Sequence, residues 1–115
     1  MRILVVDDHP DVRHLLALDL EMEGHEVVLA ATFHDAVALL GEVDLLIADR
    51  YLADGCGEVL ARLARSGGVS SIVISGSYDR RERVDDLTVH QPKPFRLSTL
   101  AQVIAEVTSP SSVVG

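Results

Sequence analysis

Short apolar runs alternate along this chain with segments of helical periodicity. Five of the runs predict strands, because each is short, rich in aliphatic or β-branched residues, and bounded by polar or turn residues. Between them, apolar residues recur three or four positions apart, which is typical of amphipathic helices. The predicted strands are residues 3–6, 27–30, 45–48, 72–74 and 88–92.

Local signals mark the ends of the predicted helices. Pro10 suits a first helical turn, and Gly24 ends that helix. Thr32 and Asp35 have capping-box spacing at the start of the second helix, which Gly41 ends. The apolar helix positions are Val12, Leu15, Leu16 and Leu20, then Val37 and Leu40, then Val59, Leu60 and Leu63, and finally Leu97, Leu100, Ile104 and Val107.

The alternation of strands and helices predicts an α/β fold with a parallel sheet and helices on both faces. Ligands of such open sheets bind beyond the carboxyl ends of the strands. The chemistry-bearing residues found there follow four different strands, yet the topology brings them to one edge. They are Asp7, Asp8, Asp49, Ser75 and Lys93.

Three carboxylates at one edge of a sheet need a cation. Two unit charges ~4 Å apart repel by about 1 kcal/mol in water and about 4 kcal/mol at an effective dielectric constant of 20. A hard ion such as Mg²⁺ binds carboxylates, waters and phosphate oxygens. Lys93 adds a mobile positive charge, and Ser75 adds a hydroxyl donor. Together these groups suit a phosphoryl group, either of a bound ligand or transferred to the protein.

Composition and charge narrow the function further. The chain has 115 residues, enough for one domain with one core, and 48% of them are hydrophobic but only 3% aromatic. Its net charge of −8 argues against binding to nucleic acids or anionic membranes. The single cysteine, Cys56, excludes an internal disulfide and suits a reducing, cytoplasmic location. No stretch is long enough to span a membrane.

The motifs resemble those of receiver domains from the response regulators of two-component signalling. The matching pieces are VVDD, LLIAD ending at Asp49, Gly57 eight residues further on, ISG and KPF. The resemblance runs from Arg2 to about Val107. It implies a flavodoxin-like (βα)5 three-layer sandwich whose five parallel strands have the order 2-1-3-4-5. Residues 1–108 are then the receiver domain, and 109–115 a flexible tail or the start of a linker.

The resemblance also implies a Mg²⁺-dependent phosphoacceptor site, with Mn²⁺ as a substitute ion. Asp49 would be the nucleophile that takes a phosphoryl group from a phosphohistidine. Asp8 and Asp49 would bind the ion directly together with the backbone carbonyl of Tyr51, and Asp7 would help through water.

Other positions would hold or tune the transferred group. Ser75 and Lys93 would bind the phosphoryl oxygens. Tyr51 and Ser77 occupy the places where the family tunes hydrolysis, and a bulky Tyr51 is expected to slow it. His90 occupies the place of a switch aromatic residue. The five histidines share no metal-ligand spacing, so all are expected to be surface or structural residues, with His9 an ordinary loop residue.

The chain departs from the family pattern near its fourth helix. The interval from Ser75 to Lys93 is short by roughly one helical turn, so that helix should be short or irregular. The charged segment 79–86 within it is predicted to be a solvated face. Pro92 lies inside the fifth strand, which is tolerable if that strand forms the sheet edge.

The implied partners are a histidine kinase or phosphotransfer protein, an effector domain or output protein, and a second copy in a phosphorylation-linked homodimer. Such a domain is a signalling phosphoacceptor, not an enzyme, and catalyses only its own phosphorylation and dephosphorylation. A module excised from a larger response regulator or hybrid histidine kinase would look the same. Alternatives are an interaction module independent of phosphate, a flavin-binding protein, and a phosphatase with an aspartyl nucleophile. DDHPDV would repel a flavin phosphate, and Tyr51 stands where such a phosphatase needs a general acid.

Overall fold

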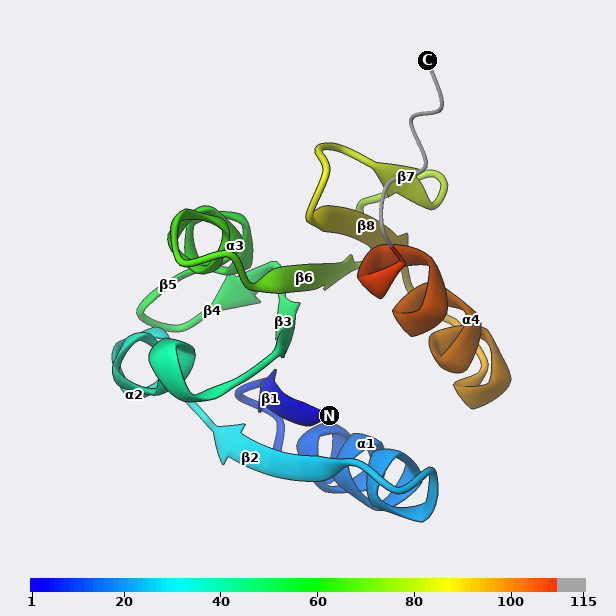
Figure 1. Cartoon of the computed structure of the whole chain (residues 1–115), viewed down its shortest axis with the longest axis horizontal. Coiled ribbons are helices and arrows are strands. Elements are labelled where there is room, and N and C mark those ends of the chain that lie inside the picture. The colour runs from blue at the N-terminus through cyan, green and yellow to red at the C-terminus, as the bar shows by residue number, and fades with distance from the viewer. Residues whose placement is uncertain (110–115) are drawn as a thin grey trace.

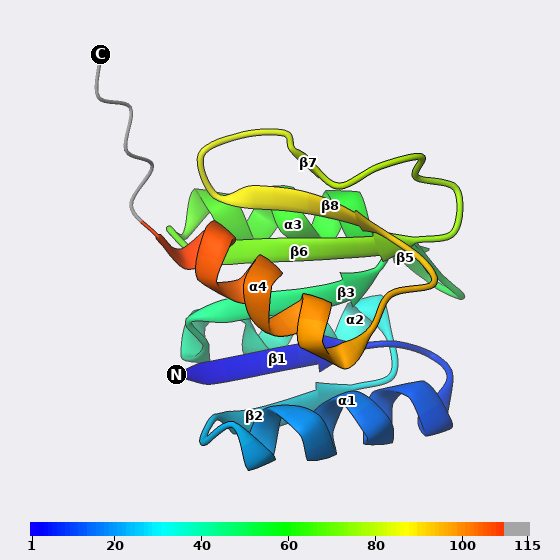
Figure 2. The same ribbon diagram turned by 90° about the vertical axis from the view of Figure 1, so that its right-hand side faces the viewer.

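The computed structural model describes residues 1–109 and shows a central sheet covered by helices on both faces (Figures 1 and 2). The main sheet has the order β2-β1-β3-β6-β8-β7, and every neighbouring pair is parallel except β7 with β8. Its strands are β1 (Arg2–Val6), β2 (Glu26–Ala30), β3 (Leu45–Asp49), β6 (Ser70–Ser75), β7 (Glu82–Arg83) and β8 (Thr88–Pro92).

The five longer strands are the five predicted from sequence, and their order is the expected 2-1-3-4-5. A separate hairpin pairs β4 (Tyr51–Leu52) with β5 (Gly55–Cys56). The helices are α1 (Pro10–Met22), α2 (Phe33–Leu39), α3 (Gly57–Ser66) and α4 (Leu97–Thr108), with a 3₁₀ turn at Leu40–Glu42. The α/β, flavodoxin-like fold class is therefore confirmed.

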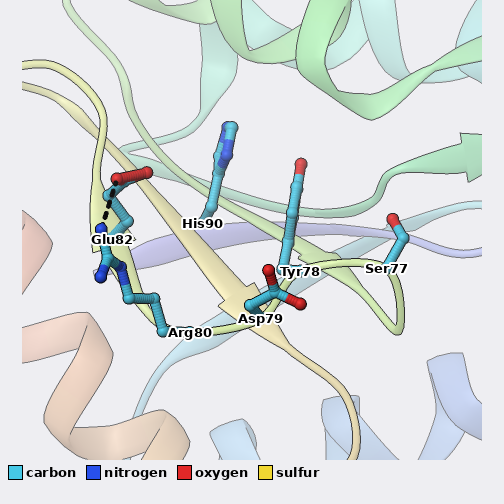
Figure 3. Close-up of a pocket in the computed structure, with 6 residues that line it drawn as sticks. All are labelled: Ser77, Tyr78, Asp79, Arg80, Glu82 and His90. Atoms are coloured by element: carbon cyan, nitrogen blue, oxygen red, sulfur yellow. Dashed lines mark ion pairs between the residues drawn. The ribbon is translucent and has the colours of Figure 1, made fainter.

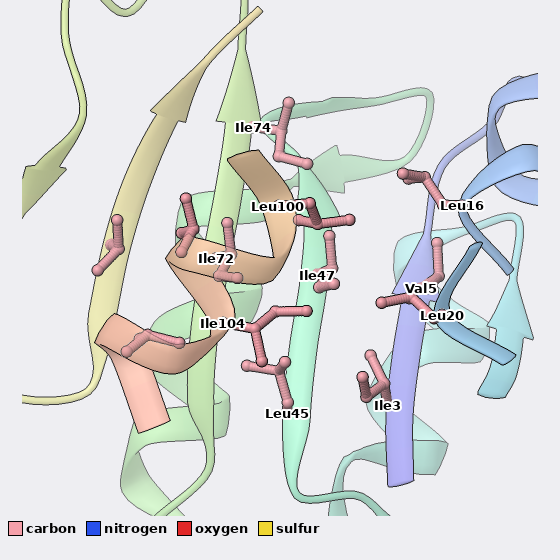
Figure 4. Close-up of a cluster of buried hydrophobic side chains, with 13 residues drawn as sticks. Ile3, Val5, Leu16, Leu20, Leu45, Ile47, Ile72, Ile74, Leu100 and Ile104 are labelled. Atoms are coloured by element: carbon pink, nitrogen blue, oxygen red, sulfur yellow. The ribbon is translucent and has the colours of Figure 1, made fainter. Parts of the chain in front are cut away.

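Successive side chains of a strand point to opposite sides of the sheet, and the central strands β1, β3 and β6 are buried on both sides. One set, including Ile3 and Val5, packs with Leu16 of α1 and Leu100 of α4 (Figure 4). The alternate set, beginning with Leu4, packs against α2 and α3. Helices α1 and α4 therefore cover one face of the sheet and α2 and α3 the other (Figure 1).

In α1, α2 and α3 the structure buries only some of the apolar positions that repeat at helical spacing. In α1 the buried residues are Leu16, Ala17 and Leu20, whereas Leu15 is 55% exposed. Leu15 lies about 100° round the helix from Leu16, so it points away from the sheet. The same correction applies to other predicted helix positions that the structure leaves exposed, which are Val12, Val37, Val59 and Leu63.

The start of α2 is capped twice. The Thr32 hydroxyl accepts a hydrogen bond from the Asp35 N–H at 3.1 Å, as the capping spacing predicts. The Asp54 carboxylate, from the β4–β5 hairpin, accepts from the N–H groups of Phe33 at 2.8 Å and His34 at 3.0 Å. These backbone hydrogen bonds lower the pKa of Asp54. This second cap holds the β4–β5 hairpin, which follows Asp49 in the chain, against the start of α2.

Between Ser75 and Thr88 the chain forms no helix. This confirms the prediction that the helix expected between the fourth and fifth long strands is short or irregular. The charged segment 79–86 is mostly exposed, as expected, but two of its residues form β7, antiparallel to β8, with Glu82 opposite His90. The fifth strand is therefore not the outermost one, contrary to the sequence expectation. Pro92, its last residue, lies opposite Ser75 and beyond the stretch that β7 covers.

Two other sequence expectations concern the ends of the chain and membranes. Helix α4 ends at Thr108, the last residue of the expected domain. Of the expected tail 109–115 only Ser109 is among the described residues, so that boundary stays a prediction. Among residues 1–109 there is no helix with the length and hydropathy needed to cross a bilayer.

Candidate functional site

Four parallel strands deliver the candidate residues to one edge of the sheet. The arrowheads of β1, β3, β6 and β8 point to the same edge in Figure 2. Asp7 follows β1, Asp49 and Ser75 are the last residues of β3 and β6, and Lys93 follows β8. The register places Asp49 beside Ile74, so the strand ends are level with one another. Asp7, Asp49 and Ser75 are all at least nine-tenths buried, whereas Asp8 is exposed.

The predicted carboxylates converge on one cluster. Side-chain ligand atoms of Asp7, Asp8, His9 and Asp49 all lie within 4.8 Å of one another. Two of the carboxylates are buried, and the exposed Asp8 opens the cluster to solvent. Carboxylate oxygens are the ligands that hard divalent ions prefer. The donor set therefore fits the Mg²⁺ or Mn²⁺ site expected from sequence. That the backbone carbonyl of Tyr51 is a further ligand of the ion stays a prediction.

His9 also belongs to this cluster, although it is an exposed residue in the loop between β1 and α1, as the sequence predicts. Its Nδ1 lies 3.2 Å from Asp7 Oδ1 and 3.1 Å from Asp8 Oδ1. Its backbone N–H also donates to Asp7 Oδ1 at 2.8 Å. The ring remains 71% exposed, so it covers the carboxylates from the solvent side. The only sequence signal was its position directly after the acidic pair.

Lys93 places a positive charge beside Asp49. Its Nζ lies 3.3 Å from Asp49 Oδ2. Its backbone N–H donates to the Ser75 carbonyl oxygen at 3.0 Å, which continues the β6–β8 ladder past Pro92. The side chain is about one-third exposed, so it can adjust to a group that enters from solvent.

Gly57 fixes the position of Asp49 through the backbone. A Cβ at residue 57 would lie 2.2 Å from the Asp49 carbonyl oxygen. The Gly57 N–H donates to the Arg50 carbonyl oxygen at 2.7 Å. Helix α3 can therefore begin directly against the end of β3 only if residue 57 has no side chain. This contact gives a physical reason for the glycine that follows Asp49 by eight residues.

The hydroxyl of Ser75 is held within a polar network that the sequence did not reveal. Ser75 Oγ lies 2.7 Å from Ser77 Oγ and accepts from the Ser77 N–H at 3.0 Å. Arg50 Nη1 donates to Ser77 Oγ at 2.8 Å, and Arg50 Nε lies 3.0 Å from Glu58 Oε2. Arg50 and Ser77 are 27 residues apart, so no local pattern could have paired them.

The network extends to strand β8 through Tyr78 and His90. The Tyr78 hydroxyl donates to Glu58 Oε2 at 2.5 Å, and its ring stacks on the His90 imidazole with centroids 4.5 Å apart. The two rings lie parallel over a hollow of about 440 Å³ (Figure 3). Burial raises the pKa of Tyr78, with Glu58 adding to the effect, and lowers the pKa of His90. In this structure His90 is therefore a stacking partner, and its switching role stays a prediction.

The geometry agrees with comparisons with known proteins. The family model described as "Response regulator receiver domain" matches residues 3–105. Transcriptional regulatory protein AruR of Pseudomonas aeruginosa is 33% identical over 88% of this chain and 48% of its own length. Virulence transcriptional regulatory protein PhoP of Salmonella typhimurium is 33% identical over 84% of this chain and 47% of its own. The chain thus spans about half the length of these curated relatives.

Solved structures give the same result at the level of one domain. The receiver domain from hybrid histidine kinase CckA is 31% identical, with a TM-score of 0.75, over 93% of this chain and 98% of that one. A CheY-like receiver domain protein from Methanospirillum hungatei is 28% identical, also with a TM-score of 0.75, over 91% and 90% of the two chains.

Proposed function

This chain belongs to the response regulator receiver domain family, and we propose on that basis that it accepts a phosphoryl group on Asp49 in a reaction that requires Mg²⁺ or Mn²⁺. The observation that carries the proposal is the convergence of Asp7, Asp8 and Asp49 beside Lys93 at one edge of the sheet. Ser75 completes the set on the neighbouring strand. A solvated group of surface carboxylates would not bury two of its members and pair one of them with an ammonium group.

The roles follow from the chemistry of each side chain. A carboxylate oxygen of Asp49 attacks the phosphorus in line, the P–N bond of the donor phosphohistidine breaks, and its imidazole leaves and takes up a proton. Lys93 and the Ser75 hydroxyl donate to the phosphoryl oxygens. Asp8 and Asp49, the Tyr51 carbonyl, and Asp7 through water would hold the metal. A bound divalent ion would offset the negative charge shared by the carboxylates and the phosphoryl group.

The source of the phosphoryl group would be a histidine kinase or phosphotransfer protein, which must bring its histidine to within bonding distance of Asp49. An apolar strip on α1 is suited to that contact, because Leu15, Leu18 and Met22 are 55%, 51% and 87% exposed. Pro10, at the start of the same helix, shares a surface hollow with Leu15 and Leu18. We infer that this strip is the docking surface for the donor.

The longer relatives imply that the phosphorylated domain acts on something else. Because this chain spans about half of each regulator, we propose that its output is an effector domain or a separate output protein. The likeness to the CckA receiver keeps a module from a hybrid kinase as the alternative. A homodimer linked to phosphorylation also stays a proposal. We infer that self-phosphorylation and dephosphorylation are the only reactions that the domain catalyses.

Intact mass after incubation with a small-molecule phosphodonor tests the proposal. Wild type should gain one phosphoryl group only when Mg²⁺ is present. Asp49→Asn should gain none. Asp35→Asn should behave as wild type, because Asp35 lies in the first turn of α2, outside the cluster. A folded wild type that gains no group with Mg²⁺ present would refute the proposal and favour an interaction module independent of phosphate.

A further inference from the structure

The Ser75 hydroxyl can donate one hydrogen bond and accept two. Its oxygen already accepts from the Ser77 N–H at 3.0 Å, which leaves one lone pair and one hydrogen. The Ser77 hydroxyl lies 2.7 Å away, and one of the two hydroxyls must donate to the other. If Ser77 donates, both lone pairs of Ser75 are occupied and its hydrogen is free. If Ser75 donates, its hydrogen is used up inside the protein.

Arg50 biases this choice. A guanidinium group is only a donor, so Ser77 Oγ accepts from Arg50 Nη1 at 2.8 Å. The positive charge repels the hydrogen of the Ser77 hydroxyl and turns it away from Arg50. Ser75 Oγ, 2.7 Å away, can accept that hydrogen. The hydrogen bonds then run in one direction, from Arg50 to Ser77 to Ser75, and successive bonds with the same direction polarise one another.

We propose that Arg50 and Ser77 form a donor chain that keeps the Ser75 hydrogen free for a phosphoryl oxygen. Arg50 and Ser77 are positioning residues, because of these three residues only Ser75 touches the phosphoryl group. This inference deepens the proposed function and rests on it for the identity of the acceptor, while the direction of the chain is a property of the free protein. It assigns a role to the residue directly after the phosphoacceptor.

Arg50 is well held for this role. Glu58 binds its Nε at 3.0 Å, which directs the other end of the guanidinium group to Ser77. The guanidinium carbon also lies 5.2 Å from the ring centroids of both Tyr51 and Tyr78, within the range of a cation–π contact. The Arg50 side chain is only 29% exposed. A fixed cation has more influence on a neighbouring hydroxyl than a mobile one, because its orientation is set before the phosphoryl group arrives.

Neutron diffraction from crystals of the deuterated protein, free of metal and phosphate, tests the direction of the chain. The deuterium of the Ser77 hydroxyl should lie between the two Oγ atoms, pointing to Ser75. A deuterium bonded to Ser75 Oγ and pointing to Ser77 would overturn the proposal. This measurement does not depend on whether the protein accepts a phosphoryl group.

The rate of adduct formation with the small-molecule phosphodonor and Mg²⁺ tests the consequence. Arg50→Met should slow the reaction roughly three- to tenfold, the range expected for loss of one hydrogen bond, because Ser77 can then accept the hydrogen of Ser75. Ser77→Ala removes that competing acceptor together with the donor, so it should react at close to the wild-type rate and should restore that rate in the Arg50→Met background. Ser77→Thr keeps the hydroxyl and should leave the effect of Arg50→Met unchanged. Arg62→Met, a change at an exposed arginine of α3, is the matched control.

The outcomes separate this proposal from the proposed function. If wild type forms the adduct but Arg50→Met forms it equally fast, or if Ser77→Ala does not restore the rate of Arg50→Met, the donor chain is wrong and the phosphoacceptor role stands. If wild type forms no adduct, the phosphoacceptor role fails, and the neutron map still decides the direction of the chain.

Discussion

Replacing Gly57 by alanine should damage both the stability of the domain and the position of Asp49. The added Cβ would lie 2.2 Å from the Asp49 carbonyl oxygen, whereas real Cβ contacts are essentially never closer than 3.0 Å. The end of β3 and the start of α3 must therefore separate by about 0.8 Å. Both sides of the contact are backbone, so no side-chain rotation can relieve it. The 2.7 Å hydrogen bond from the Gly57 N–H to the Arg50 carbonyl would stretch as well.

We expect a loss of about 3 kcal/mol in the free energy of unfolding, near the upper end for overpacked sites. For a domain of this size each kcal/mol lowers the melting temperature by about 4 °C, so the loss should be about 12 °C. Alanine favours helix over glycine by up to about 1 kcal/mol, which opposes the clash only in part. Gly41→Ala is the matched control, since a Cβ there has no atom within 4 Å. It should melt within about 3 °C of wild type.

Thermal melts followed by circular dichroism measure both variants. Adduct formation is then compared at a temperature where each remains folded. Gly57→Ala should react more slowly, because moving the Asp49 carbonyl also moves its side chain relative to Lys93 and Ser75. A Gly57→Ala protein that melts within 2 °C of wild type would refute the argument that this contact fixes the end of β3.

Three further predictions concern charge, pH and docking. Without metal, Asp49→Asn should raise the melting temperature, because it relieves repulsion between carboxylates. Mg²⁺ at ten times its Kd should add about 1.4 kcal/mol to the unfolding free energy of wild type and less to that of the variant. Equal Mg²⁺ shifts in the two proteins would exclude Asp49 as a ligand. Burial lowers the pKa of His90, so its neutral form stabilises the fold above the unfolded pKa of 6.5, and that contribution is lost as pH falls through it. Urea titrations at pH 7.5 and 5.5 should therefore show a larger loss for wild type than for His90→Phe, and equal losses would contradict this. Leu18→Asp should slow phosphotransfer from the kinase that reacts fastest in a panel, but leave the small-molecule reaction unchanged; equal slowing of both would argue against docking on α1.

The sequence predicted the convergence of Asp7, Asp8 and Asp49 that the structure shows, because the positions just beyond buried strands follow from topology alone. Ile3 to Val6 must be a strand buried on both faces, so Asp7 necessarily lies at its carboxyl end. The same reasoning placed Asp49, which ends β3. Once the strands are parallel, these ends share one edge of the sheet, and no knowledge of side-chain contacts is needed to predict their convergence.

What the sequence missed depends on contacts between distant segments. Strand β7 consists of two charged residues with no apolar alternation, and it forms because the outer edge of β8 offers unpaired hydrogen-bonding groups. Arg50 resembles any surface arginine until the fold brings Ser77 and Glu58 around it. The spacing of the histidines does not predict the contacts of His9, whose partners are the two carboxylates that precede it.

The missing helix between β6 and β8 leaves the site intact for a geometric reason. The segment 76–87 only has to return the chain from the carboxyl end of β6 to the start of β8, along strands of five or six residues. That distance is about 17–20 Å, and twelve residues can span it without a helix. The β6–β8 register, with Ser75 opposite Pro92, keeps Lys93 next to Asp49 whatever the connection is made of. The same connection begins directly after Ser75 and carries Ser77 and Tyr78. The surface formed by this connection can therefore differ from that of a helix while Asp49, Ser75 and Lys93 keep their positions.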